Sequence, residues 1–199
     1  MISRVLKPVA TRAITPAARA MLRIGLTPNS VTIFGAIGVV AAAFALYPSG
    51  HFFIGTLVVT VFVLSDLFDG TMARISEQGS SPWGSFLDST IDRVADSSVL
   101  IALMLYLIKF SDPLVPVVLV ALVTGVLVPY IRAKAESLGI ECSGGFAERT
   151  ERLIIALVAI GLHGLHLPFA LAVGMWVLAI LGVVTVAQRI LIVRNATHG

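Results

Sequence analysis

Residues 65–93 read SDLFDGTMARISEQGSSPWGSFLDSTIDR, and the interpretation of the whole chain starts from this stretch. It begins near the end of one long apolar run, Phe52–Ile75, and ends inside the next, Phe86–Ile108. Because so short a loop joins the two runs, they are expected to form antiparallel neighbouring helices. Four carboxylates lie in these runs near the loop: Asp66, Asp69, Asp88 and Asp92.

The spacing of the four aspartates places them in pairs on helix faces. Asp66 and Asp69 are three residues apart, and Asp88 and Asp92 are four apart, so each pair shares one face of its helix. A charge inside a membrane-spanning helix is costly. Four carboxylates facing each other at that depth must therefore be protonated, paired with bases or neutralised by metal.

A metal site is the interpretation that these residue types favour. Carboxylate oxygens without Cys or His nearby select a hard cation such as Mg²⁺ or Mn²⁺, and four negative charges match two such ions. Salt bridges to Arg74 and Arg93 are an alternative, although two bases do not balance four acids. An ion-coupled transporter is another, because acids within the membrane also serve ion relays. Asp96, one turn deeper, is expected to support the site rather than to bind metal.

Composition makes the chain an integral membrane protein. Of its 199 residues, 57% are hydrophobic and 13% charged, against about 25% charged in soluble domains. The sequence predicts an all-α, polytopic protein with six transmembrane helices in a single domain, the bundle covering residues 30–193. The six apolar runs are Ser30–Leu46, Phe52–Ile75, Phe86–Ile108, Pro113–Ser137, Leu153–Leu165 and Pro168–Val193. The single Cys142 excludes an intramolecular disulfide framework.

The charges outside the apolar runs predict orientation. Residues 1–24 interleave bases with apolar residues, which is typical of an N-terminal amphipathic helix lying in the headgroup region, although a basic tail that only sets topology is an alternative. With six spans, 13 of the 14 Lys and Arg residues lie on one side and Lys109 alone lies on the other. The positive-inside rule then places both termini and the aspartates at the cytoplasmic face of the cell membrane. Contact with anionic membrane lipid explains the excess of basic over acidic residues, and no nucleic-acid partner is expected.

The full pattern resembles a known signature. Asp66-x2-Asp69-Gly70-x2-Ala73-Arg74-x9-Gly84-x3-Asp88-x3-Asp92 is similar to the motif of the CDP-alcohol phosphotransferase family. The resemblance implies an enzyme that transfers a substituted phosphate from a CDP-linked donor to an alcohol and releases CMP. It also implies that all four motif aspartates contribute to a metal site and that Asp92 is the general base.

The same resemblance implies where the CDP moiety binds. The segment Thr27–Thr32 is similar to the nucleotide-contacting segment of the family, and Gly70 and Arg74 match positions that contact CDP. Ser80, in the loop, is a weaker candidate. The nucleotide-contacting residues that we expect are Asn29, Ser30, Val31, Thr32, Gly70, Ala73, Arg74 and Ser80.

The acceptor alcohol is predicted from basic residues near the predicted cytoplasmic ends of the last three spans. Arg132, Lys134, Arg149, Arg152 and Arg189 form this set. The guanidinium of Arg can form two parallel hydrogen bonds to one phosphate, so this set of bases favours an anionic acceptor. The segments around these residues resemble the actinobacterial phosphatidylinositol-phosphate synthases, which implies CDP-diacylglycerol as donor, inositol 1-phosphate as acceptor and a homodimer. Glycerol 3-phosphate, the acceptor of phosphatidylglycerol-phosphate synthases, is the alternative, because charge does not distinguish the two.

Overall fold

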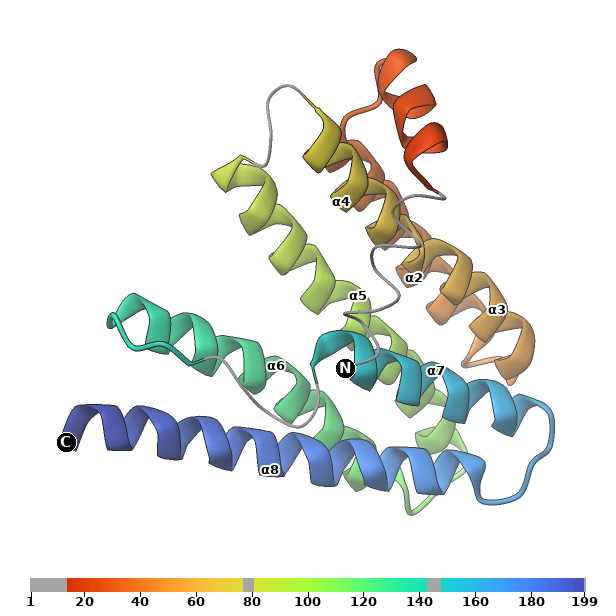
Figure 1. The fold of residues 1–199 in the computed structure, drawn as a ribbon. Helices are drawn as coiled ribbons and strands as arrows, with labels where there is room; N and C mark the ends of the chain where they lie inside the picture. Colours follow the sequence, from red (N-terminus) through yellow and green to blue (C-terminus); the bar gives the residue numbers. More distant parts are fainter. Residues whose placement is uncertain (1–13, 77–80, 143–147, 199) are drawn as a thin grey trace. The chain divides into compact units, whose positions relative to one another are not determined.

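The computed structural model of the chain describes residues 14–76, 81–142 and 148–198, and within these ranges it contains helices and no strand (Figure 1). Residues 14–23 are helical and precede the first labelled helix. The labelled helices are α2 (Pro28–Leu46), α3 (Phe52–Val63), α4 (Ser65–Ile75), α5 (Pro82–Lys109), α6 (Val115–Ser137), α7 (Arg149–Gly164) and α8 (Ala170–His198). The all-α prediction is confirmed for the described residues.

The second predicted run, Phe52–Ile75, is divided into α3 and α4. The break lies at Leu64, whose carbonyl accepts a hydrogen bond from the N–H of Leu67 at 3.1 Å, a tighter turn than the α-helical pattern. The division places Asp66 in the first turn of α4. A carboxylate is favoured there by the exposed N–H groups at the start of a helix.

Within the part of the chain that the structure describes, four segments are long and apolar enough to cross a membrane by length and composition. They are Pro28–Leu46, Phe52–Ile75, Val115–Ser137 and Ala170–Thr197. Two helices of the predicted six differ from this description. α7 has only 16 residues, about 24 Å of helix against a hydrocarbon core of about 30 Å, and α5 carries charged residues in its first half. The membrane character is therefore clear, while the number six stays a prediction.

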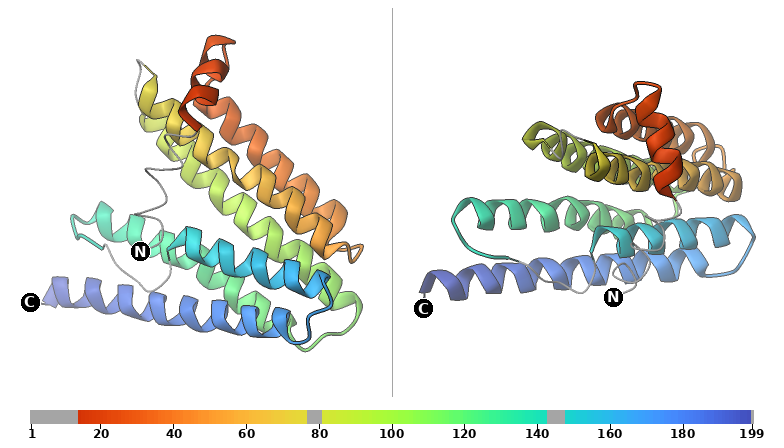
Figure 2. Two further views of the ribbon diagram at one scale, coloured as in Figure 1. Left: turned by 45° about the vertical axis from the view of Figure 1, so that its right-hand side comes forward. Right: turned by 45° about the horizontal axis from the view of Figure 1, so that its top comes forward.

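The chain forms two compact units. Unit 1 consists of residues 1–45 and 57–99, and unit 2 consists of residues 46–56 and 100–199. In unit 1, α2 packs closely along α3, because Gly38 of α2 has no side chain to hold the Phe62 ring of α3 away. A Cβ at Gly38 would lie 2.2 Å from that ring. In unit 2, α6 and α7 both pack along α8, as two further views show (Figure 2).

The helical residues 14–23 cover an apolar cluster of unit 1. Ala18 is fully buried against Val31 of α2 and Met72 of α4, and partly buried apolar residues surround these three. The surrounding residues are Ile14, Met21, Leu22, Phe68 and Ile75. Residues 14–23 are thus helical and packed through apolar side chains against protein, while an amphipathic helix over residues 1–24 in the headgroup region stays a prediction. Residues 1–13 lie outside the described part of the chain.

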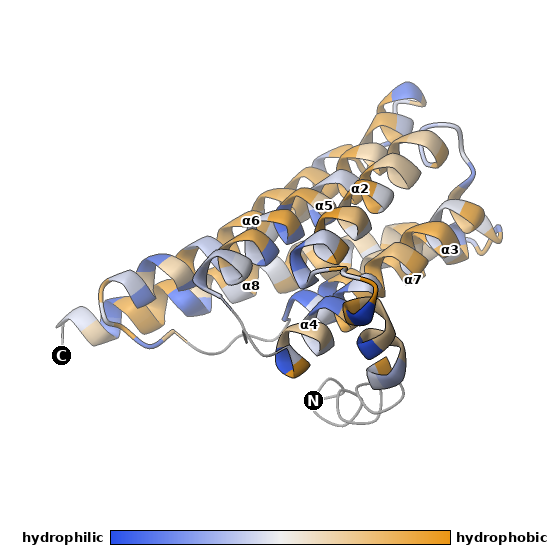
Figure 3. Cartoon of the chain, turned by 90° about the horizontal axis from the view of Figure 1, so that it is seen from above, coloured by the Kyte–Doolittle hydropathy of each residue, from blue (hydrophilic) through white to orange (hydrophobic). Residues whose placement is uncertain are grey.

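Apolar side chains also face outward along the helices. Figure 3 shows hydrophobic residues over most of the helix lengths, with hydrophilic ones on α4 and toward the C-terminal end of α8. Phe34 and Ile37 of α2 are 68% and 62% exposed. A helix that is apolar on its exposed face as well as its buried one is typical of a membrane protein. A reaction that involves water-soluble substrates is therefore expected at the polar ends of the helices.

Candidate active site

The start of α2 is determined by the Thr27-Pro28 pair. The N–H of Ser30 donates to Oγ1 of Thr27 at 3.2 Å, which is the N-cap contact that threonine makes three residues before its partner. Pro28 then occupies the first helical position, where its missing N–H is not needed. This capping places Asn29 and Thr32 in the first turns of α2.

Thr32 joins α2 to the aspartate pair of α4. Its hydroxyl donates to Oδ2 of Asp69 at 2.6 Å, and the two residues are 6% exposed each. Oγ1 of Thr32 also lies 3.1 Å from the carbonyl oxygen of Pro28. The contact links residues 37 positions apart in the sequence, so neither helix periodicity nor motif spacing could have predicted it.

The other carboxylates of unit 1 lie near Asp69. Asp66 is half-buried, Asp88 is exposed, and both are close enough to Asp69 to interact with its charge. Asp92 is 8% exposed, and its Oδ2 lies 3.6 Å from a terminal nitrogen of Arg93. The alternative of pairing with bases therefore describes Asp92 in part. The other base in that alternative, Arg74, donates to Oγ1 of Thr71 at 3.2 Å.

These carboxylates form a suitable donor set for a divalent cation. They supply only oxygen atoms, which is the chemistry that Mg²⁺ and Mn²⁺ prefer, and Asp69 is already held by a hydroxyl donor. Within the described ranges, no three Asp, Glu, His or Cys side chains approach one another closely enough to form a complete ligand cluster. The structure thus brings Asp66, Asp69 and Asp88 into electrostatic range without closing them around one point.

Small residues leave space beside the acids. A Cβ at Gly70 would meet only a terminal nitrogen of Arg74, at 3.9 Å, so the backbone of α4 is open there. Ala73 is half-buried and Arg74 is exposed in the last turn of α4. An open backbone next to an exposed guanidinium is suited to a phosphate group.

The remaining predicted nucleotide contacts divide into two groups. Asn29, in the first turn of α2, lies beside the start of α5: a Cβ at Gly84 would be 3.1 Å from Oδ1 of Asn29, so the motif glycine allows this approach. Ser30 is exposed, whereas the side chain of Val31 is buried in the apolar cluster with Ala18 and Met72. Ser80 lies outside the described residues.

The predicted acceptor-binding bases lie in unit 2. Arg132 and Lys134 are exposed near the end of α6, Arg149 and Arg152 are half-buried at the start of α7, and Arg189 of α8 is 7% exposed. Nε of Arg132 donates to Glu136 at 2.8 Å within its own helix. Arg189 donates to the carbonyl oxygen of Val128 and lies in electrostatic range of Arg132, so at least these two bases are brought together.

Sequence reasoning missed the acids beside these bases. Glu136 and Glu148 lie in electrostatic range of both Arg132 and Arg189, and so does the buried Cys142. The i, i+4 spacing of Arg132 and Glu136 is a signal that could have identified the first of these acids. No comparable signal exists for Glu148, which precedes α7 as part of its capping box with Glu151.

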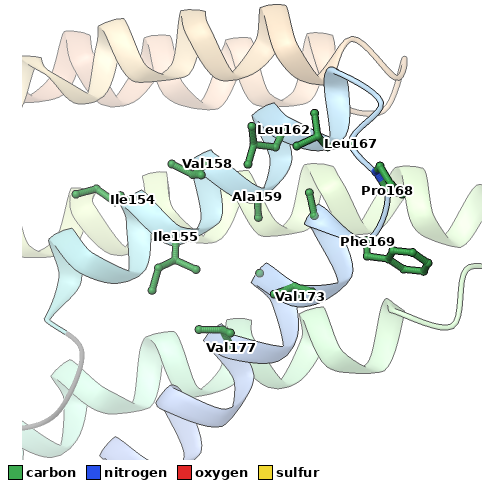
Figure 4. A pocket seen from close by; sticks show the side chains of 12 residues that line it. Ile154, Ile155, Val158, Ala159, Leu162, Leu167, Pro168, Phe169, Val173 and Val177 are labelled. Atoms are coloured by element: carbon green, nitrogen blue, oxygen red, sulfur yellow. The ribbon is translucent and has the colours of Figure 1, made fainter.

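A separate apolar groove runs along α7 and α8 of unit 2 (Figure 4). Its volume is about 490 Å³, and its lining includes Ile155 and Val158 of α7 and Val173 and Val177 of α8. Figure 4 shows that side chains from both helices line it, with Phe169 at one end. The lining contains no titratable side chain. The groove therefore offers nothing for phosphate or metal chemistry.

Comparison with known proteins identifies close relatives. The chain matches the family described as CDP-alcohol phosphatidyltransferase over residues 25–193. It is 41% identical over 204 residues to a phosphatidylinositol phosphate synthase of Streptomyces avermitilis, covering 98% of this chain and 83% of the relative. It is 46% identical over 185 residues to the Mycobacterium tuberculosis protein of the same name, covering 90% and 84%.

Solved structures give the same result. A crystal structure of the Mycobacterium tuberculosis phosphatidylinositol phosphate synthase with CDP-DAG bound matches with a TM-score of 0.87 and 45% identity, covering 92% of this chain and 94% of that one. A second structure of that protein, in complex with manganese and citrate, matches with a TM-score of 0.85 and 45% identity, covering 90% and 88%.

Proposed function

The chain belongs to the CDP-alcohol phosphatidyltransferase family, and on that premise we propose that it is a phosphatidylinositol-phosphate synthase. It transfers the phosphatidyl group from CDP-diacylglycerol to inositol 1-phosphate and releases CMP. The observation that carries the proposal is the likeness, at 45% identity over nine tenths of the chain, to a synthase of that name crystallised with CDP-DAG. Because the family consists of transferases, the ion-coupled transporter is no longer a candidate.

The donor site is proposed for the polar end of unit 1. Asn29, Ser30, Val31, Thr32, Gly70, Ala73, Arg74 and Ser80 are its proposed residues. The open backbone at Gly70 and the exposed Arg74 support this assignment, since a pyrophosphate needs both close approach and positive charge. The contact of Asn29 with the start of α5 adds a polar group beside the same helices.

Asp66, Asp69, Asp88 and Asp92 would hold the divalent cations, which are Mg²⁺ or Mn²⁺ and number two in this proposal. When bound, these ions neutralise charge on the pyrophosphate and on the departing CMP. The relative crystallised with manganese supports a metal of this kind. The all-oxygen donor set in unit 1 supports it independently.

Asp92 is the proposed general base. Its carboxylate takes the proton from the attacking hydroxyl of the acceptor as the oxygen forms its bond to the phosphatidyl phosphorus. The bond from that phosphorus to the CMP oxygen breaks, and CMP leaves with the electron pair. Positioning matters more than covalent help in such transfers. The burial of Asp92 beside Arg93 suits a fixed base.

The acceptor phosphate is assigned to the bases of unit 2: Arg132, Lys134, Arg149, Arg152 and Arg189. Arginines that approach one another repel unless acids or a bound anion compensate. Arg132 and Arg189 have Glu136 and Glu148 nearby, so an acceptor phosphate would compete with these acids. Phosphatidylglycerol-phosphate synthase, with glycerol 3-phosphate as acceptor, is the second candidate, because its acceptor carries the same phosphate.

The membrane arrangement is proposed as one domain with six spans. α5 and α7 join the four apolar segments as spans, and residues 1–24 form the interfacial helix. Both termini and the active site face the cytoplasm of the cell membrane, as the distribution of Lys and Arg indicates. We further propose that the protein is a homodimer.

The test is an acceptor assay with the purified full-length chain. The chain is incubated with CDP-diacylglycerol, Mg²⁺ or Mn²⁺, and either inositol 1-phosphate or glycerol 3-phosphate, and CMP release and the lipid product are measured. Release with inositol 1-phosphate supports the proposal. Release with glycerol 3-phosphate alone would replace the acceptor, and release with neither would remove the proposed reaction.

A further inference from the structure

The hydroxyl of Thr32 differs from those of other buried threonines in the structure. Thr124 and Thr185 donate to carbonyl oxygens of their own helices, such as Leu181 for Thr185 at 2.7 Å, which is the usual arrangement for a threonine in a helix. Thr32 has such a carbonyl at 3.1 Å, but a carboxylate oxygen of Asp69 at 2.6 Å. The shorter distance is typical of a hydroxyl bound to a charged acceptor.

The backbone around this contact is held on both sides. Val31, next to Thr32, and Met72, one turn after Asp69, are buried together with Ala18. The N–H of Gly70 also interacts with the Asp69 carboxylate. α2 and α4 are therefore joined by apolar packing beside the hydrogen bond, and the carboxylate is restrained by a hydroxyl and a backbone N–H.

We propose that Thr32 is a positioning residue for metal binding, and that it acts by orienting the carboxylate of Asp69. The sequence assigned Thr32 to the nucleotide, so this role is a different one. The inference depends on the proposed function, in which Asp69 is a metal ligand. Groups that orient a metal ligand contribute to metal affinity. Their loss commonly weakens metal binding by about 10- to 100-fold.

The test measures Mn²⁺ affinity directly, without turnover. The full-length chain in detergent is titrated with Mn²⁺ and followed by electron paramagnetic resonance. Thr32→Val, which keeps the shape and removes the hydroxyl, raises the Kd for Mn²⁺ by about 10- to 100-fold. Thr32→Ser, which keeps the hydroxyl, stays close to the parent chain. Thr185→Val is the matched control, because it removes a buried hydroxyl that donates to a carbonyl oxygen of its own helix.

A double-mutant cycle identifies the route of the effect. If Thr32 acts through Asp69, then Thr32→Val changes Mn²⁺ affinity little once Asp69→Asn is present. Full, additive losses in the double variant would overturn the proposal. Thr32→Ala replaces Thr32→Val should the latter fail to give monodisperse protein.

Two other outcomes separate this proposal from the function on which it rests. If Asp69→Asn leaves Mn²⁺ affinity unchanged, the metal assignment of the proposed function is wrong. If Asp69→Asn weakens Mn²⁺ binding but Thr32→Val raises only the KM for CDP-diacylglycerol, Thr32 is a nucleotide contact and the positioning role is wrong.

Discussion

Unit 1 and unit 2 hold their predicted site residues in different ways. In unit 1, a hydrogen bond joins Thr32 of α2 to Asp69 of α4, and Asn29 of α2 lies beside Gly84 of α5. In unit 2, the buried Arg189 of α8 is also held across helices, by the carbonyl oxygen of Val128 in α6, but Arg132 pairs with Glu136 of its own helix, and both of these side chains are about half exposed. Exposed pairs contribute about 0–1 kcal/mol, so they are easily exchanged for another partner. Fixed carboxylates suit chemistry that needs positioning, whereas exchangeable cations suit a substrate that enters and leaves.

The largest expected effect is the loss of Asp92. Asp92→Asn keeps the size of the side chain but removes its ability to take a proton, so we expect kcat to fall by about 10²- to 10⁴-fold. Binding of CDP-diacylglycerol, measured by calorimetry, should largely survive. Asp96→Asn is the control, since Asp96 lies one turn deeper in the same helix. Equal losses in the two variants would show that charge in α5, rather than one base, supports turnover.

The next effect tests one of the proposed acceptor-binding bases of unit 2, the half-buried Arg152. Arg152→Ala should raise the KM for inositol 1-phosphate by about 10- to 100-fold, because a hydrogen bond to a charged group is lost, while the KM for CDP-diacylglycerol changes little. Arg194→Ala, at an exposed position near the end of α8, serves as the control. Equal changes in both KM values would assign Arg152 to topology or folding and would weaken the contrast between the two units.

A smaller effect tests the open space in unit 1. A Cβ at Gly70 meets nothing closer than 3.9 Å, so Gly70→Ala should leave the melting temperature of the protein unchanged. If a pyrophosphate lies against this backbone, the added methyl group should still raise the KM for CDP-diacylglycerol by about tenfold, equivalent to about 1.4 kcal/mol. Unchanged KM and unchanged stability together would show that the donor does not approach α4 at this residue.

The motif residues could be predicted from the sequence because spacing along a helix determines which side chains share a face. Asp66 and Asp69 lie in α4, and Asp88 and Asp92 lie in α5, as the spacing indicates. The break at Leu64 was not predicted, because the run was interpreted as one helix, although Ser65 and Asp66 directly after Leu64 are residue types that often begin a helix. The start of α7 at Arg149, four residues before the predicted Leu153, was missed for a related reason: a capping box, not hydropathy, begins that helix.

Contacts between distant segments could not be predicted in the same way. The bond from Thr32 to Asp69 depends on how α2 meets α4, and that meeting is determined by packing at Ala18, Val31 and Met72. The position of Glu148 near Arg132 and Arg189 depends in the same way on how the start of α7 meets α6 and α8. A single sequence gives the residue types in these segments but does not show which residues of distant segments contact each other.

The smallest expected effect concerns stability in unit 2, away from either set of site residues. Tyr47 is fully buried, its hydroxyl lies 3.2 Å from Oγ1 of Thr56, and burial raises the pKa of this phenol to about 12. Since the pKa is higher in the folded state than in the unfolded chain, the contribution to stability is complete below about pH 10 and is lost as the pH rises toward 12.

Tyr47→Phe should therefore lower the free energy of unfolding by about 1 kcal/mol at neutral pH, because one hydrogen bond is lost, and leave turnover unchanged. Between pH 10 and 12 the variant should lose less stability than the parent chain, because it has no phenol to ionise. Thermal unfolding in detergent across this range measures both effects, and Tyr130→Phe, at a position 61% exposed, is the matched control. A loss of turnover in Tyr47→Phe would mean that packing around Tyr47 in unit 2 affects catalysis. The contrast between the fixed carboxylates of unit 1 and the exchangeable ion pair of unit 2 would then not explain how the two units contribute to turnover.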